Sequence, residues 1–121
     1  MRNFAGIPDE YASFERAAVL LQSIPYDGTS TWGKGADRGF DAFLEAAENM
    51  ELYDIETDSE VYRKGIHIPP DWRGFKSPEA MFETVYAETQ RALATDKFLT
   101  FFGVVLVVCF WTNSILSTES A

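Results

Sequence analysis

A glycine-rich segment, residues 27–39, is the part of this sequence best suited to contact a ligand. It follows an apolar run that stops at Pro25, and open α/β sheets place ligand-binding loops after such strands. Its four glycines let the backbone approach a ligand or another chain closely. The spacing matches neither a phosphate-binding loop nor a dinucleotide fingerprint. From the residues alone, a plain glycine-rich connection stays the alternative interpretation.

Other side chains that often carry chemistry stand alone in the sequence. His67 is the single histidine and has no second histidine or nearby cysteine with which to form a metal cluster, so we expect a loop residue. Ser30 would need a neighbouring histidine to act as a nucleophile. Asp54, Glu56 and Asp58 alternate along a strand-like stretch and could hold a hard cation, although a solvated strand face explains them more simply.

Composition indicates one small folded domain and limits its partners. The chain has 121 residues, of which 46% are hydrophobic and 15% aromatic. A net charge of −9 argues against nucleic acid, because phosphate binding needs clustered lysine and arginine. The lone Cys109 excludes an internal disulfide and is expected to be a small buried hydrophobe, with a reactive thiol as the alternative. No signal-peptide pattern opens the sequence, which predicts a cytoplasmic protein.

The elements that must position these residues alternate between strand and helix. The apolar run at 17–26 predicts a buried parallel strand, with a helix from Tyr11 as the alternative. The remaining predictions are a helix at 40–50, a half-buried strand at 52–56, a loop at 58–74, a helix from Ser77 to about residue 94 and a second central strand at 98–102. This order suggests one edge of an α/β sheet rather than a complete fold.

The helix that begins near Ser77 has the clearest local signals. Ser77 can cap the free amides, Pro78 suits the first turn, and Glu79 favours the positive end of the helix dipole. The predicted apolar face consists of Met81, Phe82, Val85, Tyr86, Thr89 and Leu93.

Several of these segments together resemble the arginase/agmatinase/formimidoylglutamase superfamily, with agmatinase as the nearest branch. The resemblance covers about residues 10–103. It is carried by the runs Val19–Tyr26, Asp27–Gly39, Ala42–Ala46, Leu52–Thr57 and Lys97–Gly103. The family comprises hydrolases acting on linear amidines, so the resemblance implies the N-terminal part of a three-layer α/β/α sandwich with a parallel sheet. It further implies a guanidino substrate, homo-oligomers and, for agmatinase, a place in polyamine biosynthesis.

The resemblance also implies a mechanism and a substrate loop. Family members use two Mn²⁺ ions to hold a hydroxide that attacks the guanidinium carbon and releases urea, and agmatinase yields putrescine as the other product. The implied substrate-loop residues in this chain are Asp27, Gly28, Thr29, Ser30, Gly35 and Gly39.

The sequence departs from the family after Gly103. A second glycine, an acidic residue and a ligand histidine are expected there, but the chain reads Val104-Val105-Leu106-Val107-Val108. None of the family's ligand motifs is present, so we expect no bound manganese, no catalytic residues and no activity of this chain alone. Phe40 also stands where the family usually has proline. The abrupt change suggests a frameshift or a gene-model error, and divides the chain into a ureohydrolase-like portion, 1–103, and an apolar non-family tail, 104–121.

The charge-free segment 98–116 supports two interpretations. Its length could span a bilayer, which would make the chain a membrane-tethered or partner-binding protein. Its valines favour a strand instead, and without a charged residue to discourage pairing we expect a strand-like tail prone to aggregation. On this view, deleting 104–121 should improve solubility.

Overall fold

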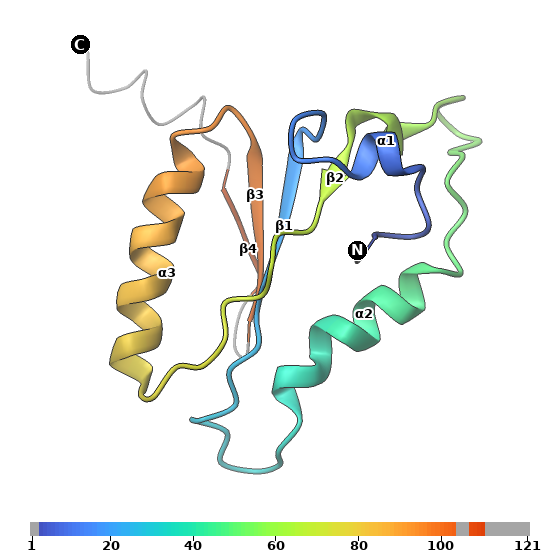
Figure 1. The fold of residues 1–121 in the computed structure, drawn as a ribbon. Helices are drawn as coiled ribbons and strands as arrows, with labels where there is room; N and C mark the ends of the chain where they lie inside the picture. Colours follow the sequence, from blue (N-terminus) through green and yellow to red (C-terminus); the bar gives the residue numbers. More distant parts are fainter. Residues whose placement is uncertain (1–2, 104–106, 111–121) are drawn as a thin grey trace.

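The computed structural model describes residues 3–103, together with the backbone of 107–110, and shows an α/β unit built on one sheet (Figure 1). The strand order is β2-β1-β3-β4. The first three strands are parallel and β4 is antiparallel to β3. Their bounds are β1 (Val19–Ile24), β2 (Ile66–His67), β3 (Phe98–Gly103) and β4 (Val107–Phe110).

The pairing of β1 with β3 forms the centre of the sheet and confirms that these two predicted strands are parallel neighbours. The register runs from Val19 opposite Phe98 to Ile24 opposite Gly103. Five of the six residues of β1 are buried, as expected for a strand covered on both faces. The alternative helix is limited to the short α1 (Asp9–Ala12).

Helices cover both faces of this sheet, which confirms the predicted three-layer arrangement (Figure 1). On one face, α2 (Gly39–Ala47) contributes Phe40 to a cluster with Leu21 of β1. On the other face, α3 (Pro78–Leu93) packs against a cluster that includes Leu20 and Leu99. Each strand of the central pair therefore supplies side chains to both layers of the core.

The start of α3 agrees with the sequence, and its predicted apolar face agrees in part. Ser77 accepts a hydrogen bond from the Ala80 amide, as a capping residue should. Phe82 and Tyr86, predicted to face the core, are 63% and 57% exposed and stack on each other. The residues of α3 that pack against the core are Met81, Val85 and Ala92.

Two predictions for the middle of the chain were wrong. Residues 52–56 form a bend, a turn and one isolated bridge, between Asp54 and Ser59, rather than a strand. The Asp54 carboxylate accepts hydrogen bonds from the Glu56 and Thr57 amides, so a side chain takes the backbone groups that a strand would need. The acidic residues there consequently do not share a strand face.

The predicted loop at 58–74 contains a 3₁₀ helix, η2 (Val61–Lys64), and then β2. His67 therefore lies in a strand that pairs with the beginning of β1, opposite Leu20. The two-residue strand is defined by this pairing and not by any local pattern.

The charge-free segment 98–116 is described only in part. Phe98–Gly103 and Val107–Phe110 are strands, whereas 104–106 and 111–116 lie outside the described residues, as do the expected burial of Cys109 and most of the proposed tail. Among the residues that the structure describes, no helix has the length and apolarity needed to cross a bilayer.

Candidate functional site

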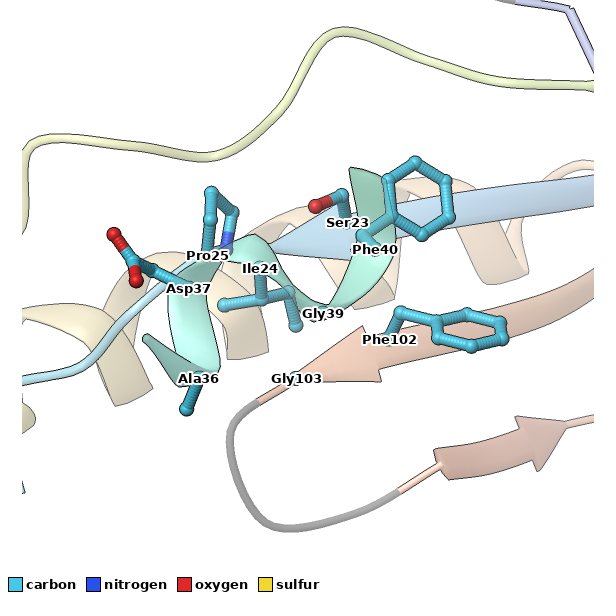
Figure 2. Close-up of a pocket in the computed structure, with 9 residues that line it drawn as sticks. All are labelled: Ser23, Ile24, Pro25, Ala36, Asp37, Gly39, Phe40, Phe102 and Gly103. Atoms are coloured by element: carbon cyan, nitrogen blue, oxygen red, sulfur yellow. The ribbon is translucent and has the colours of Figure 1, made fainter. Parts of the chain in front are cut away.

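A small hollow lies where β1 and β3 reach their carboxyl ends, beside the start of α2 (Figure 2). Its volume is about 150 Å³. A 3₁₀ helix, η1 (Ala36–Arg38), leads directly into α2 and forms part of the rim. The lining residues are Ser23, Ile24, Pro25, Ala36, Asp37, Gly39, Phe40, Phe102 and Gly103.

Aromatic rings form one wall of the hollow. Phe40 of α2 and Phe102 of β3 lie with their ring centroids 5.4 Å apart, and both rings contact Phe43. Phe40 is only 5% exposed. Its large side chain therefore lies in the core between α2 and the sheet.

Two polar residues line the hollow. Ser23 is 1% exposed, and its hydroxyl has no hydrogen-bond partner among the described residues. Asp37, at the rim, is exposed. A buried hydroxyl without a partner can both donate and accept a hydrogen bond. The hollow therefore suits a water molecule, or a small molecule that places one polar group near Ser23.

The glycine-rich loop is held together by Asp27. Its carboxylate accepts hydrogen bonds from the Ser30 hydroxyl and from the Gly35 amide, the latter at 2.6 Å. Its carbonyl accepts a hydrogen bond from Lys34 Nζ, also at 2.6 Å. Two hydrogen bonds lower the pKa of Asp27 below its usual value: the one from the Ser30 hydroxyl has the largest effect, and the one from the Gly35 amide the next largest. Asp27 therefore organises the loop and joins it to the residues that begin η1.

The structure separates the six predicted loop residues into three groups. Asp27, Ser30 and Gly35 close the loop on itself, and Gly35 has a φ of 121° that favours glycine. Gly28 and Thr29 are exposed on the loop, and of the six only Gly39 lines the hollow.

Sequence reasoning missed Ser23, Phe40 and Phe102 as site residues. One signal was present for Ser23, because a serine within an otherwise apolar buried strand must find a partner or remain unsatisfied.

His67 and Ser30 are not brought together. His67 pairs with the beginning of β1, whereas Ser30 follows the carboxyl end of that strand. The Nδ1 atom of His67 lies 2.8 Å from the Ala12 carbonyl oxygen, and the ring packs edge-on against Phe14. The histidine thus links β2 to the segment after α1 and is not placed to act as a base for Ser30.

The described residues do not fit a manganese site. Within 3–103, for which side chains are described, no group of three or more His, Cys, Asp or Glu side chains is placed to hold a metal ion. Among the residues that the structure describes, Asp37 is the one carboxylate that lines the hollow. A single carboxylate is too few ligands for a divalent ion that a protein must hold firmly.

A wider surface groove of about 510 Å³ runs between the loop at 71–76 and α3. Two of its lining residues, Arg73 and Asp71, are paired: Arg73 Nε donates a hydrogen bond of 2.9 Å to the Asp71 carboxylate. Since this arginine is already paired within the loop, the groove offers a ligand fewer free charges than its lining suggests.

Comparison with known proteins identifies relatives for part of the chain, although no family model matches it. A segment of 44 residues is 43% identical to the N(1)-aminopropylagmatine ureohydrolase of Synechocystis sp. and covers 36% of this chain and 14% of that protein. The fold is similar to that of the agmatine ureohydrolase of Thermoplasma volcanium, with a TM-score of 0.71 and 19% identity. That similarity covers 84% of this chain and 33% of the other.

These findings confirm the resemblance seen in the sequence. The chain has an agmatinase-like fold and partial homology to an aminopropylagmatine ureohydrolase, and it spans about a third of the solved agmatine ureohydrolase chain.

Proposed function

We propose that this chain is the N-terminal portion of an agmatinase-type domain and is inactive alone. The structural similarity over 84% of the chain carries this proposal. In such a domain, residues 1–103 supply the central strands and one wall of a site for a guanidino compound, and 104–121 form a tail foreign to the family. Hydrolysis of a guanidinium group at neutral pH needs a metal-activated hydroxide, and the described residues provide no set of ligands for it.

Activity measurements test the proposal that the chain is inactive alone. The purified chain is incubated with Mn²⁺ and either agmatine or N(1)-aminopropylagmatine, and urea is measured against a protein-free blank. We expect no urea above that blank. Urea release that increases with added Mn²⁺ and persists through a second purification would contradict the proposal.

A chimeric enzyme tests the proposal that this chain is the N-terminal portion of an agmatinase-type domain. Residues 10–103 of this chain replace the corresponding segment of the Synechocystis sp. enzyme, which keeps its own downstream residues. If the segment is a genuine agmatinase-type N-terminal portion, the chimera releases urea in a Mn²⁺-dependent manner. A chimera that is folded and binds Mn²⁺ but has no activity would show that this segment does not form a working site.

A further inference from the structure

The edge of β3 that faces away from β1 is covered by β4. The register places Leu99 opposite Phe110, Thr100 opposite Cys109, Phe101 opposite Val108 and Phe102 opposite Val107. An uncovered strand edge presents a row of unpaired amide and carbonyl groups, to which a strand of another chain can bind. No charged side chain occurs between residues 98 and 116 to discourage such binding.

The direction of each β3 amide follows from one hydrogen bond. The Phe98 amide donates to the Ala18 carbonyl, on the β1 side, at 2.8 Å. Since amide directions alternate along a strand, the Thr100 and Phe102 amides also face β1, whereas those of Leu99 and Phe101 face β4. Leu99 and Phe101 are therefore in the hydrogen-bonded pairs of the antiparallel ladder.

We propose that β4 is an internal edge cap, which keeps β3 from pairing with a second copy of this chain. The edge of the sheet then consists of the four residues of β4 instead of the six of β3, and a shorter edge strand is a poorer template for pairing. The cap consists of Val107–Phe110, and its hydrogen bonds to β3 use the amide and carbonyl of Val108 and Phe110. The proposal is independent of any ureohydrolase activity, because it concerns only the edge of the sheet. It gives the apolar residues after Gly103 a role in this chain.

Two proline substitutions in the full chain test the cap. Val108→Pro removes an amide that donates to β3, whereas Val107→Pro removes one that points away from β3 and is the matched control. In Val108→Pro, hydrogen exchange of the Leu99 and Phe101 amides should accelerate on the order of tenfold or more, while the Thr100 and Phe102 amides stay protected. Equal exchange in the two variants, or unprotected Leu99 and Phe101 amides in the unaltered chain, would overturn the proposal.

A disulfide gives a second measurement that does not depend on the folding of the proline variant. Thr100 and Cys109 form a non-hydrogen-bonded pair, in which Cα atoms are about 4.5 Å apart, within the range of a disulfide. Thr100→Cys should therefore form an intramolecular disulfide with Cys109 on mild oxidation, and Phe98→Cys, two residues along the strand, should not. Equal disulfide yields would overturn the register. The oxidised Thr100→Cys chain should also self-associate less than its reduced form in sedimentation experiments, and equal association would overturn the protective role.

Discussion

At the scale of single residues, the Asp27 carboxylate accepts hydrogen bonds from Ser30 and Gly35, and these bonds lower its pKa below the ordinary value of 3.8. A group with a lowered pKa in the folded chain stabilises the fold above the unfolded-state pKa and loses that contribution as the pH falls through the folded-state pKa. The loop should therefore remain closed at neutral pH and open below pH 3.8. The Gly35 amide chemical shift, followed by NMR, should titrate with a midpoint below this value, and a midpoint above it would refute the assignment.

The buried hydroxyl of Ser23 leads to a second prediction at this scale. Because this hydroxyl has no partner among the described residues, Ser23→Ala removes an unsatisfied buried group and should raise the free energy of unfolding, by up to about 1–3 kcal/mol. A satisfied buried hydroxyl would instead contribute about 1 kcal/mol or more. Urea denaturation of the two proteins distinguishes the cases. A clear loss of stability would indicate that water or a solute satisfies Ser23 in solution.

At the scale of elements, Gly65 allows the turn from η2 into β2 to pack against the segment that precedes β1. An added Cβ atom would lie 2.7 Å from the Cα atom of Ala17. Gly74 has nearly the same φ, +82° against +83°, but open space around it. Gly65→Ala should therefore lower the free energy of unfolding by roughly 1–3 kcal/mol more than Gly74→Ala. Equal losses would show that the backbone angle alone matters at Gly65.

The cap of α3 can be tested by a pair of substitutions. Ser77→Ala removes the acceptor of the Ala80 amide and should cost about 1 kcal/mol, whereas Ser77→Asn keeps a side-chain acceptor and should cost little. Thermal unfolding of both variants provides the measurement. Indistinguishable losses would mean that the hydroxyl contributes no capping energy.

Elements with local signals were predictable, and those that depend on distant partners were not. The apolar run of β1 and the Ser77 cap of α3 predict where these two elements lie to within a few residues. By contrast, β2 exists because Ile66 lies beside Val19, and no local period reveals that pairing. The candidate site behaves similarly: the loop after β1 was predicted, but the hollow joins Ser23 to Phe102, which only the sheet brings together.

At the scale of the whole molecule, the pairing of β4 changes the expected effect of removing the tail. From the sequence, deletion of 104–121 should improve solubility because it removes apolar surface. If β4 caps the sheet, the same deletion uncovers β3 and should increase self-association, whereas deletion of 111–121 should not. Light scattering of both truncated chains compares the two effects. Improved solubility after the larger deletion would favour the sequence-based expectation.

The pairing of β1 with β3 also bears on how the chain is made. Lys97 donates a hydrogen bond to the carbonyl of Ala17 across 80 positions of sequence, so β1 is synthesised long before its central partner. At about 5–20 residues per second, the ribosome needs roughly 4–16 s to add the intervening residues. During that interval Leu20, Leu21 and Ile24 have no β3 to pack beside. For several seconds, the nascent chain therefore contains the apolar side chains of β1 without the strand that buries them in the finished fold.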